Sequence, residues 1–134
     1  MRIVLDTNIL VSALLSPSGP PASILDLITV GELTLLLDDR ILAEYREVLR
    51  RRRFSFNRDE VDELVAYLDR VAEHVIPLPL GIEIPDPDDL PFLEVAVASQ
   101  ADTLITGNKK DYGSPPKGLR ISSPAEFLQG FKKK

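Results

Sequence analysis

Short apolar runs alternate along this chain with longer segments in which apolar residues recur every three or four positions. The runs at 2–6 (RIVLD) and 33–37 (LTLLL) are apolar at nearly every position, which is typical of strands buried on both faces of a parallel sheet. Residues 103–106 (TLIT) and 119–122 predict two further strands. Residues 74–80 (HVIPLPL) predict an extended segment at a sheet edge or in a loop, because proline cannot donate a backbone hydrogen bond inside a sheet.

The segments between these runs predict helices. Asp38 or Asp39 is expected to cap the third helix, and Asn57 or Asp59 to start the fourth. The fifth is apolar on nearly every side and is therefore expected to be buried. The predicted helices cover residues 8–15, 22–30, 39–49, 57–72, 92–98 and 124–131.

This alternation of strands and helices predicts an α/β fold, with a parallel sheet that carries helices on both faces. In open sheets of this kind, ligands bind beyond the carboxyl ends of the strands. The candidate functional residues are therefore sought directly after the predicted strands.

Composition excludes several kinds of site. The chain has 134 residues, the size of one domain, and no cysteine, which excludes disulfides, thiolate metal sites and cysteine nucleophiles. Its one histidine, His74, is expected to be structural or solvated. The first apolar stretch is interrupted by Asp6 and Asn8 and lacks a cleavage site, so we expect a cytoplasmic protein with no membrane partner. No glycine-rich phosphate loop supports an ATPase or GTPase.

The net charge of −5 argues by itself against a nucleic-acid partner. The charges are segregated, however, because Arg50, Arg51, Arg52 and Arg53 are consecutive, while much of the acid lies in other clusters. These arginines are candidate RNA contacts, although a helix that ends in arginines is also favoured by its dipole. The overall charge therefore decides little.

Two acidic residues stand out by their positions. Asp6 directly follows the first strand, where it can either face a bound ligand or cap the next helix. At about 100° per residue, Glu44 falls on the flank of the apolar stripe of its helix, whereas Glu47 points to solvent. Glu44 can thus reach into a cleft or be an ordinary surface glutamate.

Further acids precede the fifth helix and follow the strand at 103–106. One of Asp86, Asp88 and Asp89 can cap the helix, and a cation among them would explain the other two, because like charges repel. Asp111 lies in the turn after the strand. Such oxygen ligands suit Mg²⁺ or Mn²⁺, and several carboxylates around Mg²⁺ are typical of phosphodiester-cleaving enzymes.

Four segments resemble, in order and with similar spacing, the motifs of the PIN-domain family of Mg²⁺-dependent nucleases, especially the VapC-like toxins of bacterial and archaeal toxin–antitoxin pairs. The segments are IVLDTNILVSALL (3–15), ILAEYREVL (41–49), DPDDLPFLEVAVASQADTLITGN (86–108) and KKDY (109–112). The resemblance covers essentially the whole chain.

By position, the resemblance implies four catalytic metal ligands, Asp6, Glu44, Asp89 and Asp111. Asp89 stands three residues before Phe92, as the family's aspartate does, and Asp86 or Asp88 would substitute or help.

Further positions carry supporting roles in the resemblance. Many relatives have aspartate where this chain has Asn108, so either Asn108 or Asp111 completes the site. Asn8, Ser12 and Thr106 resemble positions that orient the carboxylates or the water.

The resemblance further implies a three-layer α/β/α sandwich around a parallel sheet, with residues 1–134 forming a single PIN-like nuclease domain. It implies an endoribonuclease that uses Mg²⁺ or Mn²⁺, a homodimer, and a small antitoxin that blocks the site. One alternative is a non-catalytic PIN-like module that binds RNA or protein, which the departure at Asn108 leaves open. Another is a phosphatase of the haloacid-dehalogenase type, which requires a second aspartate where this chain has Asn8.

Overall fold

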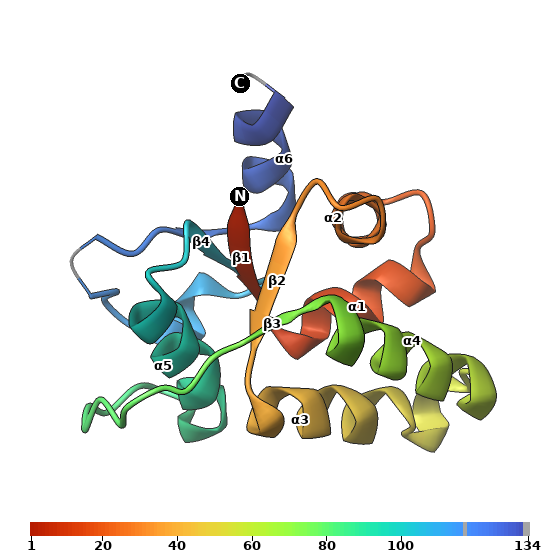
Figure 1. The fold of residues 1–134 in the computed structure, drawn as a ribbon, viewed down its shortest axis with the longest axis horizontal. Coiled ribbons are helices and arrows are strands. Elements are labelled where there is room, and N and C mark those ends of the chain that lie inside the picture. Colours follow the sequence, from red (N-terminus) through yellow and green to blue (C-terminus); the bar gives the residue numbers. More distant parts are fainter. Residues whose placement is uncertain (117, 133–134) are drawn as a thin grey trace.

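The computed structural model describes residues 1–116 and 118–132, and these residues form a sheet of five parallel strands (Figure 1). Ile3 in the central strand lies opposite Leu35 on one side and Thr103 on the other. The strands are β1 (Arg2–Leu5), β2 (Thr34–Leu37), β3 (Glu73–His74), β4 (Thr103–Ile105) and β5 (Ile121–Ser122), in the order β3-β2-β1-β4-β5. Because successive strands are added first on one side of β1 and then on the other, the topological switch point lies between β1 and β4.

Helices cover both faces of this sheet, as predicted. Figure 1 shows α5 on one side of the strands and α1, α2 and α4 on the other, and α5 packs against β1, β2 and β4. The helices of the described residues are α1 (Thr7–Leu15), α2 (Pro20–Thr29), α3 (Asp39–Leu49), α4 (Arg58–Val71), α5 (Leu90–Ser99) and α6 (Pro124–Lys132). The predicted α/β/α architecture is confirmed.

Capping residues set the starts of α3 and α4. Asp38 accepts a hydrogen bond from the backbone N of Ile41 at 3.1 Å, and Asn57 accepts one from the backbone N of Glu60 at 3.0 Å. Of each predicted pair, the first residue is therefore the cap, and Asp39 and Asp59 lie in the first turn, where the helix dipole favours an acid.

The strands supply the centre of the core. Ile3, Val4 and Leu5 of β1 are fully buried, and so are Leu36 and Leu37 of β2. The expectation that these apolar runs are covered on both faces is confirmed. In the part of the chain that the structure describes, no helix combines the length and apolarity needed to cross a membrane.

Several segments differ from expectation in detail. Helix α2 begins two residues earlier than predicted, and β5 covers only the second half of 119–122. The predicted extended segment 74–80 pairs with β2 only at its start, where the backbone N of Val75 donates to the carbonyl of Leu37 at 2.8 Å, and Ile76 beyond it is 94% exposed. The fifth helix begins two residues earlier than predicted and follows a 3-10 turn, η2 (Pro87–Asp89), which the sequence suggested to be a loop. Its burial is not complete either, because Ala98 is exposed.

Candidate active site

Asp6 lies at the carboxyl end of β1 and is 4% exposed. Its Oδ1 accepts a hydrogen bond from the backbone N of Asn8 at 3.3 Å, which makes it the cap of α1. Its Oδ2 accepts from the Thr106 hydroxyl at 2.9 Å and from the Tyr112 hydroxyl at 3.0 Å. Asp6 therefore caps the helix and is also held by two hydroxyls from the far end of the chain, which stabilise its charge in a buried position.

Two buried tyrosines flank this carboxylate. Burial, followed by the negative charge of Asp6, raises the pKa of Tyr112, which keeps its hydroxyl protonated as a donor. Tyr45 is fully buried on α3 and donates to the carbonyl of Leu5 at 2.7 Å, and burial raises its pKa too. Neither role was predicted from the sequence, where Tyr45 and Tyr112 stand only within the matched motifs ILAEYREVL and KKDY.

Glu44 extends from the flank of α3 towards the start of α1, as its helical position predicted. It is partly buried, and its Oε2 accepts a hydrogen bond from the hydroxyl of Thr7, the residue after Asp6. Burial raises the pKa of Glu44, with further repulsion from Asp6 and Asp88, while the bond from Thr7 opposes the shift. Thr7 was not identified from the sequence.

Asp89 is the acid on which the other carboxylates converge. Asp86 caps η2 by accepting from the backbone N of Asp88 at 3.0 Å, whereas Asp89 makes no capping hydrogen bond through its side chain. Burial, then repulsion from Asp6, Asp86 and Asp111 and more weakly from Glu44, raises the pKa of Asp89 to about 7. Acids from β1, α3 and two loops thus act on one carboxyl group.

Asn108 and Asp111 are joined to the same network through Thr106. The backbone N of Asn108 donates to the Thr106 hydroxyl at 3.1 Å, and its side-chain Nδ2 donates to Asp111 Oδ1 at 3.0 Å. Asn8 contributes its backbone N, and its side chain is exposed, as is that of Ser12 on α1. Among the described residues, neither of these two side chains forms a hydrogen bond with an acid of the cluster.

The chemistry of these donors fits a hard divalent cation. The converging groups are carboxylate oxygens, and their mutual repulsion is the interaction that a cation would relieve. Across residues 1–116 and 118–132, no three His, Asp or Glu side chains are arranged to hold a metal ion as they stand. His74 is exposed, and its Nε2 contacts the carbonyl of Asp69 at 2.8 Å, so it belongs to no zinc-type donor set.

An ion-pair cluster of one exposed arginine and two buried acids joins α3, which carries Glu44, to α5, which directly follows Asp89. Arg40 of α3 pairs with Asp38 at 2.8 Å and with Glu94 of α5 at 2.7 Å. Glu94 is 5% exposed and also accepts from the backbone N of Leu80 at 2.9 Å. A charged residue in the middle of an apolar helix was the sequence signal for this cluster, and it was not used.

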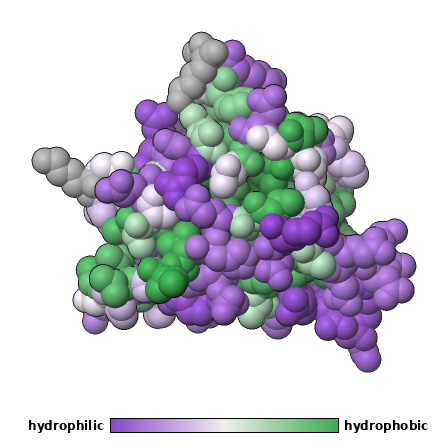
Figure 2. Space-filling model, viewed as in Figure 1, coloured by the Kyte–Doolittle hydropathy of each residue, from purple (hydrophilic) through white to green (hydrophobic). Residues whose placement is uncertain are grey.

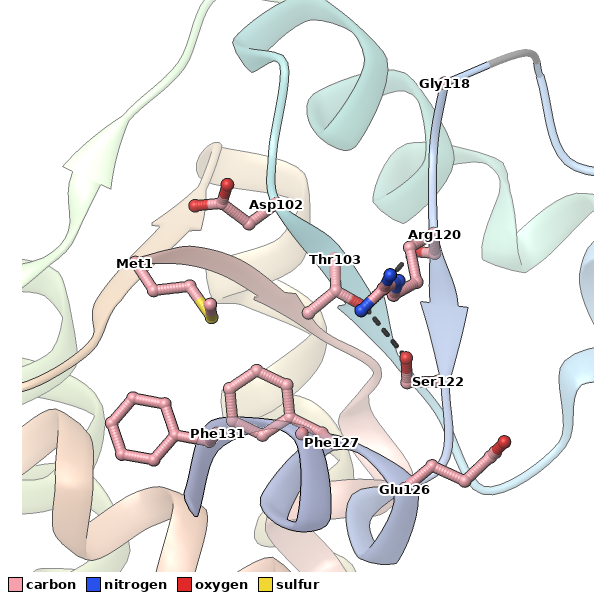
Figure 3. A pocket seen from close by; sticks show the side chains of 10 residues that line it. Met1, Asp102, Thr103, Gly118, Arg120, Ser122, Glu126, Phe127 and Phe131 are labelled. Atoms are coloured by element: carbon pink, nitrogen blue, oxygen red, sulfur yellow. Dashed lines mark hydrogen bonds between the residues drawn. The ribbon is translucent and has the colours of Figure 1, made fainter. Parts of the chain in front are cut away.

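A separate cavity of about 310 Å³ lies at the opposite end of the sheet (Figure 3). Met1, Phe127 and Phe131 line one side, and Thr103, Arg120 and Ser122 line the other. It contains none of the predicted acids, because the amino ends of β1 and β4 meet there. The acidic cluster at the carboxyl ends is therefore the candidate active site.

A family model describing the PIN domain matches residues 2–110, which include Asp6, Glu44, Asp89 and Asn108. The chain belongs to the PIN-domain family. Members of this family are typically nucleases and generally use divalent metals.

Known proteins match this PIN domain along nearly its whole length. An uncharacterized protein of Methanocaldococcus jannaschii is 29% identical over 145 aligned residues, which cover 99% of this chain and 93% of that protein. In a solved structure of VapBC2 from Rickettsia felis bound to a DNA fragment from their promoter, one chain is similar with a TM-score of 0.62 and 21% identity, covering 92% of this chain and 98% of that one. A chain of VapBC-1 from nontypeable Haemophilus influenzae is similar with a TM-score of 0.61 and 18% identity, and the match covers 93% of this chain and 99% of that one. At these identities the two structures show a shared fold.

Proposed function

We propose that this PIN domain is a Mg²⁺- or Mn²⁺-dependent endoribonuclease, with residues 1–134 forming one nuclease domain. The observation that carries the proposal is the hydrogen-bonded network at the carboxyl ends of β1 and β4, the switch point of the sheet, where Thr106 and Tyr112 hold Asp6 and Asn108 holds Asp111. Membership of a family of metal-dependent nucleases supports it.

In this proposal, Asp6, Glu44, Asp89 and Asp111 hold the cation, with Asp86 and Asp88 adding negative charge beside it. When bound, a divalent cation activates water and screens the charge that develops on a phosphodiester. Thr106 and Tyr112 fix Asp6 Oδ2, and Thr7 fixes Glu44. Without a cation, the pKa of Asp89 is about 7, and a bound cation would lower it and favour the ionised carboxylate.

We further propose that the chain is the toxin of a toxin–antitoxin pair, acts in the cytoplasm, forms a homodimer and is blocked by a small antitoxin. The shared fold with chains in VapBC complexes supports this. The adjacent reading frame separates this role from that of a housekeeping nuclease. A small antitoxin-like protein encoded there would support the toxin role. Growth arrest on expression, relieved by Asp6→Asn, is the matching cellular test.

The enzymatic proposal is tested with Asp6→Asn, which keeps the shape of the side chain and removes its charge. We expect RNA cleavage with Mg²⁺ or Mn²⁺ to fall by more than about 100-fold, beyond the loss of about 10–100-fold typical of a supporting group. Circular dichroism checks that the fold is retained. Cleavage that survives both EDTA and this substitution would overturn the proposal.

A non-catalytic RNA- or protein-binding PIN module is the second candidate. The neutral side chain of Asn108 favours it, because this residue stands where many relatives place an acid, and here it donates to Asp111. Tight RNA binding without turnover at any divalent metal would support the second candidate over the first.

A further inference from the structure

The four consecutive arginines at the end of α3 are all exposed but differ in their partners. Arg50 lies 3.6 Å from Asp62, and Arg51 pairs with Glu47 at 2.9 Å. Within the described ranges 1–116 and 118–132, Arg52 and Arg53 form no ion pair. Two positive charges therefore remain available to an external partner in a chain whose net charge is −5.

The helix dipole does not account for these two arginines. α3 ends at Leu49 with Arg50 as its cap, and Arg52 and Arg53 belong to a following 3-10 turn, η1 (Arg52–Phe54). Stabilisation by the dipole is confined to about the last turn of a helix. Arg52 and Arg53 thus lack the structural role that explains a basic residue inside the last turn of α3.

An aromatic pair gives this region a defined shape. Phe54 and Phe56 stack with ring centroids 5.6 Å apart and an angle of 14° between the rings. The guanidinium carbon of Arg53 lies 4.8 Å from the Phe54 centroid. Ser55 adopts a left-handed conformation, with φ of 55°, and both rings pack against the core. Arg53 therefore lies over an aromatic pair that packs against the core.

The last turns of α3 connect this arrangement to the candidate active site. Glu44 lies five residues before Leu49, where α3 ends, which is about 7.5 Å along the helix axis. Glu47, three residues after Glu44, pairs with Arg51, which lies beyond the helix in an extended conformation. Figure 2 shows strongly hydrophilic residues gathered at the corner where α3 ends and α4 begins.

We propose that Arg52, Arg53 and the Phe54–Phe56 pair bind single-stranded RNA that leads along α3 from the candidate active site. This rests on the proposed ribonuclease function. Guanidinium groups bind phosphates with several directed hydrogen bonds, and bases stack on arginine planes and aromatic rings. The arginine–aromatic stack favours RNA over an acidic peptide, because a peptide of acidic side chains has no aromatic ring to stack on it.

The test measures binding rather than cleavage. The full chain carrying Asp6→Asn is titrated into a fluorescent 12-nucleotide single-stranded RNA with Mg²⁺ present. We expect Arg52→Gln with Arg53→Gln to weaken binding by at least about tenfold and to reduce the slope of log affinity against log salt by about 1.4, at about 0.7 for each phosphate contact. The control pair Arg70→Gln with Arg120→Gln removes the same charge from exposed positions elsewhere, and we expect a loss below about twofold. Equal losses in the two pairs, or no loss, would overturn the inference.

A second comparison separates stacking from charge. Arg53→Lys keeps the charge and removes the planar guanidinium group. It should therefore weaken the binding of single-stranded RNA by about threefold to tenfold and leave the slope of log affinity against log salt unchanged. Duplex RNA should bind more weakly than the single strand, since its base faces are covered, and equal binding of the two would contradict the role of stacking. If the arginine variants bind RNA normally but lose affinity for a poly-glutamate peptide, the surface docks protein and the inference is wrong. Absence of cleavage by the wild-type chain would refute the ribonuclease proposal without altering these binding results.

Discussion

Asp6 stands where β1 becomes α1, and its two oxygens serve different partners. Oδ1 caps the helix, and Oδ2 is held by Thr106 and Tyr112. The sequence allowed the cap and the ligand interpretations as alternatives. The geometry shows that capping leaves the other oxygen in a network that reaches Asn108, so the cap does not exclude the proposed role.

Tyr112→Phe tests the importance of this network. It removes one of two hydroxyl donors to a buried carboxylate, so we expect a loss of about 1.5–3 kcal/mol in the free energy of unfolding and a fall of about 10–100-fold in Mg²⁺ affinity. Urea unfolding and calorimetric titration measure the two effects. Tyr45→Phe is the matched control, because its hydroxyl donates to a backbone carbonyl, and we expect it to leave Mg²⁺ affinity unchanged. Equal effects on Mg²⁺ affinity would contradict a specific role for Tyr112.

Asp89 gives a pH-dependent prediction for the protein in EDTA. Its pKa rises from an ordinary 3.8 to about 7 in the fold, so the folded state binds the proton more tightly than the unfolded chain. Stability contributed by this proton is therefore lost as pH rises from about 4 through 7. The unfolding free energy of Asp89→Asn should therefore exceed that of the wild type by an amount that grows as pH rises from about 4 to 7 and is constant above it. A difference that is independent of pH would show that Asp89 is not repelled by its neighbours.

At the scale of elements, the strands and helices could be predicted because each depends on a local pattern. The apolar runs of β1 and β2 and the stripe of α3 appear in the structure where the sequence places them. What could not be predicted are contacts between distant elements. The hydrogen bonds of Tyr112 to Asp6 and of Thr7 to Glu44 depend on how α1, α3 and the segment after β4 meet. The end of β3 likewise depends on its neighbour, because β2 ends at Leu37, the residue whose carbonyl accepts from Val75.

Gln100, which ends α5, has a backbone conformation that residues with a side chain rarely adopt. Gln100 adopts φ of 54° as the helix cap, a conformation that glycine adopts without steric cost. Gln100→Gly should therefore raise the free energy of unfolding by about 0.5–1 kcal/mol. Urea unfolding measures this gain, and Gln100→Ala should give none because alanine keeps the strain. A loss of stability in the glycine variant would show that the Gln100 side chain stabilises the fold.

At the scale of the molecule, the acidic cluster couples cation binding to the stability of the whole chain. Its members come from β1, α3 and the loops before α5 and after β4, so a cation bound among them would link these elements. At a Mg²⁺ concentration of about 100 times the Kd, binding adds about 2.7 kcal/mol, and we expect the Tm to rise by about 10 °C. Differential scanning fluorimetry with and without EDTA measures the rise. The double variant Asp6→Asn with Asp89→Asn should lose it, and an equal rise in both proteins would place the cation elsewhere.

The hydrogen bond between Asp6 and Tyr112 joins residues 106 positions apart, and that between Asp6 and Thr106 joins residues 100 apart. A ribosome makes Asp6 early and Tyr112 late, and the chain folds progressively as it emerges. The carboxylate network therefore cannot form until Tyr112 has left the exit tunnel. In the proposed nuclease, Asp6 would thus acquire its two hydroxyl donors only after residues 7–112 have been made.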